Sequence, residues 1–126
     1  MSGEESQQRK EFNDYIKSIG GLKNGYFPEK IIYKPGWVGD GWLPILKKLI
    51  EDLIELGWNK EILDIKEKFG GLRFYIHEGT DEIYNKIIKA EQESYKTCEN
   101  CGQPGQIRNN GWYKTLCDNC NKTKNS

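Results

Sequence analysis

Two pairs of cysteines near the C-terminal end constrain the fold of this chain more than any other feature. All four cysteines of the sequence lie in two Cys-x-x-Cys pairs, which fifteen residues separate. This spacing is typical of four thiolates around one tetrahedral zinc ion, in which the sulfurs of one pair lie about 3.5–4 Å apart. The sequence therefore predicts one zinc ion per chain, with the ligands Cys98, Cys101, Cys117 and Cys120.

Two disulfides, or a redox pair of the thioredoxin type, are the alternatives for these cysteines. Redox motifs seldom occur twice at this distance, and the segment from Met1 to Gln8 contains no apolar secretory stretch. We therefore expect reduced thiols in a cytoplasmic protein. Because a site closed by four cysteines leaves no coordination position for water, we expect the zinc to be structural.

The balance of charge argues against one class of partner. The chain has 19 basic and 19 acidic residues, so its formal net charge is zero. Proteins that coat nucleic acid without sequence preference carry a clear basic excess, and we expect no such coating here. No stretch approaches the roughly eighteen consecutive apolar residues of a membrane span, so we expect no membrane partner.

The spacing of apolar residues predicts three helices before the cysteines. The first is an N-terminal helix within residues 1–22. The second is the central helix of the core, residues 41–57, with Asp40 as its N-cap. The third spans residues 80–96, is capped by Thr80 and leads directly into the first cysteine pair.

A β-hairpin is predicted between the second and third helices, in residues 62–77. Its turn is assigned to Gly70-Gly71, because glycine accepts the positive φ of a two-residue hairpin turn. This turn places Phe69 opposite Leu72. The same register gives one face mostly apolar residues, Leu63 and Ile65 among them, and gives the other face the pairs Lys68–Arg73, Lys66–Tyr75 and Asp64–His77.

The remaining segments complete the predicted organisation. Residues 23–96 form an α+β core, in which Ile31 to Tyr33 resemble a short strand. Residues 97–121 form the zinc ribbon, with a hairpin made by 106–108 and 112–116, and residues 122–126 form a frayed tail. The predicted fold class is α+β: a small helical core with a β-hairpin, followed by a C-terminal zinc ribbon with four cysteine ligands.

The polar face of the core hairpin is the first candidate binding surface. Backbone at a Gly-Gly turn can approach an anion, flanking cations can pair with phosphate, and exposed aromatic rings can stack on a base. The alternatives are a solvated hairpin face and, for the two tryptophans, burial in the core. The candidate ligand-binding residues are Lys66, Lys68, Gly70, Gly71, Arg73, Tyr75, Trp37 and Trp42.

The sequence offers little for catalysis. His77 is the only histidine, and no second histidine, nucleophile motif or metal-binding carboxylate pair accompanies it. Nucleases of the His-Asn-His type need histidines near the cysteine pairs, and this chain has none there. We therefore expect a protein that is not an enzyme.

The chain resembles a family of small uncharacterised proteins from bacterial and phage genomes. The resemblance covers roughly residues 36–120 and rests on Gly39-Asp40-Gly41-Trp42, the run KEKFGGLRFY, and the tail CENCGQPG…GWYKTLCDNC. It implies an accessory protein, often carried by phages, of a kind that blocks a host protein or sequesters a nucleotide immune signal.

These observations lead to two functional hypotheses. The first is a homo-oligomeric, anti-defence binding protein that sequesters a small anionic, nucleotide-like ligand at the core hairpin. The second is an adaptor whose zinc ribbon contacts a host protein or a specific nucleic acid through Arg108, Trp112 and Tyr113.

Overall fold

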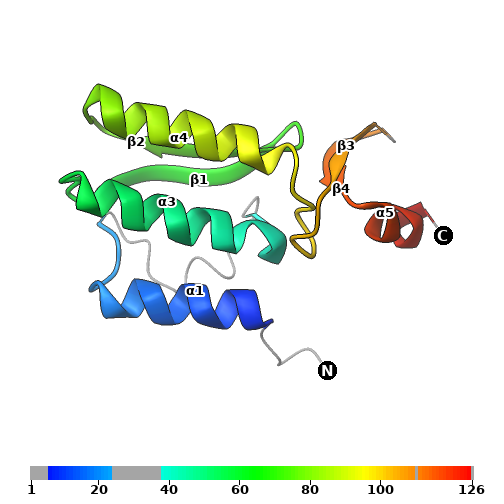
Figure 1. Cartoon of the computed structure of the whole chain (residues 1–126), viewed down its shortest axis with the longest axis horizontal. Helices are drawn as coiled ribbons and strands as arrows, with labels where there is room; N and C mark the ends of the chain where they lie inside the picture. Colours follow the sequence, from blue (N-terminus) through cyan, green and yellow to red (C-terminus); the bar gives the residue numbers. More distant parts are fainter. Residues whose placement is uncertain (1–5, 24–37, 110, 126) are drawn as a thin grey trace.

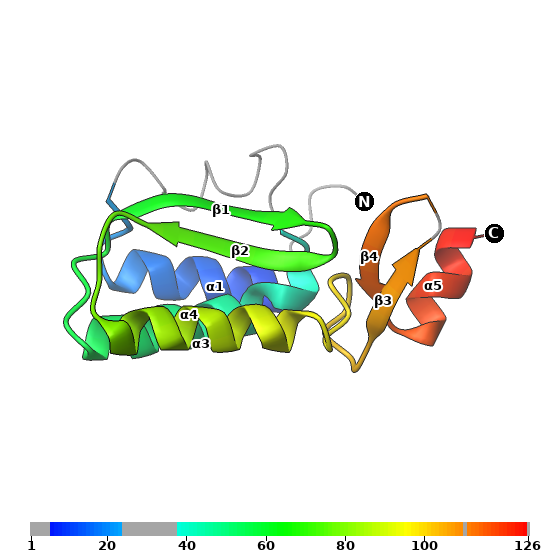
Figure 2. The same cartoon turned by 90° about the horizontal axis from the view of Figure 1, so that it is seen from above.

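The computed structural model describes residues 6–23, 38–109 and 111–125, and these segments form an α+β fold with two antiparallel hairpins. Three long helices lie side by side, the first hairpin packs along them, and the second hairpin and the last helix lie at one end (Figures 1 and 2). The elements in chain order are α1 (Gln7–Ser18), the 3-10 turn η1 (Asp40–Trp42), α3 (Leu43–Glu55), β1 (Ile62–Lys68), β2 (Gly71–Ile76), α4 (Asp81–Ser94), β3 (Gln106–Asn109), β4 (Tyr113–Leu116) and α5 (Asp118–Asn125).

Helices α1 and α4 begin at side-chain caps. The Ser6 hydroxyl accepts a hydrogen bond from the Arg9 amide at 3.0 Å, and the Thr80 hydroxyl accepts one from the Ile83 amide at 3.2 Å. Helix α3 differs from the prediction, because the 3-10 turn precedes it and Asp40 does not cap it. The Asp40 carboxylate instead pairs with the Arg9 guanidinium at 2.7 Å, which ties α1 to the start of α3.

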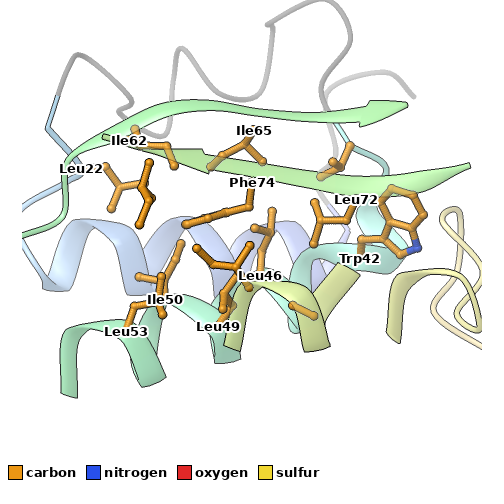
Figure 3. Packing of buried hydrophobic residues seen from close by; sticks show 14 of the residues in the cluster. Leu22, Trp42, Leu46, Leu49, Ile50, Leu53, Ile62, Ile65, Leu72 and Phe74 are labelled. Carbon is orange, nitrogen blue, oxygen red and sulfur yellow. The ribbon is translucent and has the colours of Figure 1, made fainter. Parts of the chain in front are cut away.

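The core lies between α3 and the buried face of the first hairpin (Figure 3). Leu46, Leu49, Ile50 and Leu53 recur at helical spacing on α3 and are buried. They face Ile65 and Phe74 of the hairpin, while Phe12 and Ile16 of α1 extend the same cluster. Burial of each such side chain stabilises the fold by about 1.5–3 kcal/mol, so the hairpin is held by its apolar face.

The predicted register of the first hairpin is wrong, because the turn residues are Phe69 and Gly70, with φ of 53° and 83°. Lys68 therefore pairs with Gly71, and Lys66, not Lys68, lies opposite Arg73. The shift moves each partner by two positions, so the paired residues keep their predicted faces, whereas Phe69 leaves the apolar face for the turn.

A β-bulge at the other end of the hairpin corrects a second prediction. The register shifts between Ile62 and Asp64, so Ile62 pairs with Ile76 and is buried. Leu63, which the regular alternation places on the apolar face, is 51% exposed. Asp64 lies opposite Tyr75 instead of the predicted His77.

The C-terminal segment folds around its own small cluster. Strand β3 pairs with β4 from Gln106↔Leu116 to Asn109↔Tyr113. Helix α5 follows and continues to Asn125, so most of the segment from residue 122, predicted as a frayed tail, is helical. The predicted strand at residues 31–33 and the candidate ligand residue Trp37 lie outside the described residues. In the described part of the chain, no helix is long and apolar enough to cross a membrane.

Candidate functional site

The four cysteines meet at one point. Their Sγ atoms all lie within 4.8 Å of one another, and the Sγ atoms of Cys101 and Cys117 are 3.7 Å apart. All four are free thiols, so the disulfide alternative does not describe this structure. The sulfur separation matches the edge of a tetrahedral site with metal–sulfur bonds near 2.3 Å, and the cluster can hold one metal ion.

The electrostatics of the thiols favour a bound cation. Burial raises the pKa of Cys98, but backbone hydrogen bonds from Cys117, Cys101 and Asn100 outweigh burial and lower the pKa to about 7. Burial, together with the neighbouring thiols, raises the pKa of Cys120 to about 12. One thiolate therefore forms readily, whereas a full set of four needs a positive charge at the centre of the cluster.

The first cysteine pair is fastened to the core by the segment Gly39-Asp40-Gly41-Trp42. The Gly41 amide donates to the Glu99 carbonyl at 2.9 Å, and the Trp42 Nε1 donates to the Thr97 carbonyl at 2.8 Å. A side chain at Gly41 would overlap the Cys98 carbonyl oxygen. The glycine therefore allows two backbone segments to touch, and the metal centre is built partly on the core.

Trp42 belongs to the core and not to a ligand surface. Its side chain is fully buried and belongs to the same hydrophobic cluster as Leu46 and Leu72 (Figure 3). A ring in this position cannot stack on a ligand from solvent, so the predicted ligand role of Trp42 is wrong and the core alternative describes it. The apolar indole and the polar Nε1 together explain why tryptophan suits the position.

The predicted anion-binding residues of the first hairpin are mostly engaged with other groups of the protein. The Gly70 amide donates to the Glu67 carboxylate at 2.8 Å, and the Arg73 guanidinium pairs with the Glu91 carboxylate. Gly71 is buried against the Tyr95 ring, which occupies the space that a side chain would need. The Gly70 amide therefore has a carboxylate partner within the hairpin itself.

Three of the predicted ligand residues remain at the surface. Lys66 lies 3.6 Å from the Asp64 carboxylate and 5.8 Å from the centre of the Tyr75 ring. Tyr75 and Lys68 are exposed. His77 is also exposed, and Asp64, its predicted cross-strand partner, lies opposite Tyr75 instead, so this pairing does not orient the imidazole as a base.

A cleft lies where the turn of the first hairpin meets the ribbon, and only part of it could be identified from the sequence. Its volume is about 420 Å³, and its lining combines three aromatic rings with three charged side chains. Trp112 is 77% exposed, Phe69 62% and Tyr113 48%. The lining residues are Glu67, Lys68, Phe69, Trp112, Tyr113 and Lys114.

The two walls of the cleft are joined by direct contacts. The rings of Phe69 and Tyr113 meet edge to face with their centres 6.4 Å apart. Behind them, the buried Thr115 hydroxyl donates to the Gly70 carbonyl at 2.7 Å. The predicted register places Phe69 on the apolar face, and its exposure follows only from the observed turn at Phe69-Gly70.

Comparison with known proteins adds no family or fold relative. No family description, curated protein or solved structure matches this chain.

Proposed function

We propose that this chain is a non-catalytic adaptor that binds a protein partner through the cleft between the first hairpin and the ribbon, and that a structural zinc ion holds the ribbon. Four thiols within 4.8 Å of one another form a soft, closed donor set, which suits zinc better than magnesium or calcium. Zinc would stabilise the thiolates and fix the strand that carries Tyr113. In native mass spectrometry, a mass higher than that of the chain by one zinc ion would support this assignment. A mass equal to that of the chain alone would contradict it.

The exposed aromatic cleft is the observation that carries the proposed function. Solvent-exposed tryptophan, tyrosine and phenylalanine side chains are costly to leave in water and are enriched where partners bind. Phe69, Trp112 and Tyr113 gather on one surface, although they come from two segments more than forty residues apart. Ile107 on β3 is also exposed and belongs to the ribbon hairpin that carries Tyr113.

The charges near the cleft favour a protein over a polyphosphate. Lys114 lies 3.4 Å from the Glu99 carboxylate, and Arg73 and Lys66 each have a carboxylate partner of their own. A phosphate would have to compete with these carboxylates. An adaptor of this kind would suit the accessory, phage-type role that the sequence resemblance implies.

The small-ligand hypothesis remains a second candidate because one observation favours it. Lys66 and Tyr75 lie together on the outer face of the hairpin, and Lys68 is on the same face. A nucleotide could stack on Tyr75 with its phosphate near the lysines. An additional nucleotide-sized mass on the native protein, lost in Lys66→Ala, would favour this candidate over the adaptor.

Affinity purification from the source cells tests the adaptor. We expect tagged zinc-loaded protein to retain a partner that Trp112→Ala loses and that Tyr84→Ala retains. Tyr84 is a matched control, because it is an exposed aromatic residue on α4, outside the residues that line the cleft. If wild type and Trp112→Ala retain the same co-purifying proteins, the adaptor function is contradicted. The comparison requires that the circular dichroism spectrum and the zinc content of the variant are unchanged.

A further inference from the structure

We infer that the cleft recognises a peptide segment in which a large apolar side chain stands beside an aspartate or glutamate. This inference rests on the proposed adaptor function and specifies the chemistry of its partner. Three features of the cleft carry it: its apolar lining, a lysine that makes no ion pair within the described residues, and its fixed walls.

The apolar lining selects a side chain that can leave water. The rings of Phe69, Trp112 and Tyr113 supply the large exposed surfaces, and the volume of about 420 Å³ falls within the roughly 300–1,000 Å³ of ordinary binding pockets. A leucine, phenylalanine or tryptophan of the partner would cover these rings. Such anchors supply most of the binding energy at protein interfaces.

The cation available to a partner is the ammonium group of Lys68. The other cleft lysine, Lys114, is next to the buried Glu99 carboxylate, and the Glu67 carboxylate accepts a hydrogen bond from the Gly70 amide at the turn. Lys68 makes no ion pair within the described residues, and its Nζ lies 5.6 Å from the centre of the Phe69 ring. A positive charge thus lies directly beside the apolar surface, and a partner carboxylate next to the anchor would pair with it.

The walls are held in place before any partner arrives. The hydrogen bond from Thr115 to the Gly70 carbonyl is buried, and a side chain at Gly70 would come within 3.4 Å of the Tyr113 backbone. The hairpin turn therefore lies close to β4 and is joined to it by this hydrogen bond. Because a preformed cleft loses little conformational entropy on binding, a short peptide is enough to occupy it.

Selection from a library of random twelve-residue peptides on the immobilised, zinc-loaded full chain tests the inference. We expect the enriched peptides to place an aromatic or large aliphatic residue within two positions of an aspartate or glutamate. Trp112→Ala should lose this enrichment at least tenfold. Lys68→Glu should change the preference from acidic to basic flanking residues. The control Lys89→Glu, at an exposed position on α4, should leave the preference unchanged.

The outcomes separate this inference from the proposed function. If enriched peptides show no acidic bias, or keep that bias in Lys68→Glu, the inference is wrong even where purification from cells finds a protein that depends on Trp112. If no peptide is enriched over the Trp112→Ala background, the peptide inference also fails. Enrichment that follows the charge at position 68 would support it, because a merely structural lysine would not reverse the preference.

Discussion

The indole Nε1 of Trp42 donates a hydrogen bond to the carbonyl oxygen of Thr97, one residue before the first cysteine of the metal centre. Trp42 is also part of the main hydrophobic cluster. One side chain therefore belongs to the core and to the support of the ribbon. It follows that the stability of the core and the affinity for metal should change together.

Trp42→Phe tests this coupling. The ring remains apolar, but the partly buried Thr97 carbonyl loses its donor, which should cost about 1 kcal/mol. We expect a lower free energy of unfolding in urea and weaker zinc binding in competition with a chromophoric chelator. Trp112→Phe, at an exposed position, is the control and should change neither. Unchanged zinc affinity in a destabilised Trp42→Phe would show that core and ribbon are independent.

Gly41→Ala should weaken metal binding more directly. The new methyl group would overlap the Cys98 carbonyl oxygen, so either the first cysteine pair or η1 must move. Overpacking of this kind typically costs about 1–3 kcal/mol. We expect a loss of zinc affinity in chelator competition, with Lys48→Ala on the exposed face of α3 as the control. Wild-type affinity in Gly41→Ala would mean that the backbone contact is not needed.

Acid should release the metal from the ribbon. The pKa of Cys98 is lowered to about 7 in the folded chain, so its thiolate stabilises the fold above its ordinary pKa of 9.0, and that contribution is lost as the pH falls through about 7. Protons then compete with zinc for the thiolates. A chromophoric chelator should report release that grows as the pH is lowered, because protonated thiols do not bind zinc. Retention of zinc in strong acid would argue against thiolate ligands.

The metal centre could be predicted from the sequence because two cysteine pairs at this distance have few other uses. The hairpin turn could not. Two adjacent glycines made Gly70-Gly71 the obvious turn, but Tyr95 occupies the space beside Gly71 and the chain turns at Phe69-Gly70. A residue more than twenty positions away decided the register. Between the bulge and the turn, the local pattern determined which residues share a face, because the period of a strand is two, but it did not determine their partners.

The surroundings of the predicted binding residues could not be read from the sequence for a related reason. Charges counted along one strand cannot reveal which carboxylates of other elements will meet them, and Arg73 meets Glu91 on α4. Likewise, the sequence could not predict that Phe69 and Trp112 line one cleft, because this depends on the contact between the hairpin and the ribbon. Local patterns identified Trp112 and Tyr113 as candidates, while tertiary packing added Phe69 and Lys68 to the same cleft.

Arg73→Ala should destabilise the protein, and not merely remove a surface charge. Its guanidinium pairs with Glu91 and donates to the Tyr95 hydroxyl at 3.2 Å, so it joins β2 to α4. We expect a loss of about 1–2 kcal/mol in urea unfolding, because this pair is partly buried. Lys66→Ala is the matched control on the opposite strand and should change stability by less than about 0.5 kcal/mol. If both substitutions lower the free energy of unfolding by a similarly small amount, the Arg73–Glu91 pair contributes little to stability, and Arg73 could bind a ligand instead.

Thr115→Val should separate the two walls of the cleft while it keeps the volume of the side chain nearly constant. The buried hydroxyl donates to the Gly70 carbonyl at 2.7 Å, and its loss leaves that carbonyl without this donor, at a cost of about 1–3 kcal/mol. Because the four cysteines are untouched, we expect zinc binding close to that of the wild type. Hydrogen exchange should accelerate at the hairpin turn, and library peptides should bind more weakly. Wild-type peptide affinity with fast exchange at Gly70 would show that the cleft does not depend on this contact, since its walls would then be held by the rings of Phe69 and Tyr113 alone.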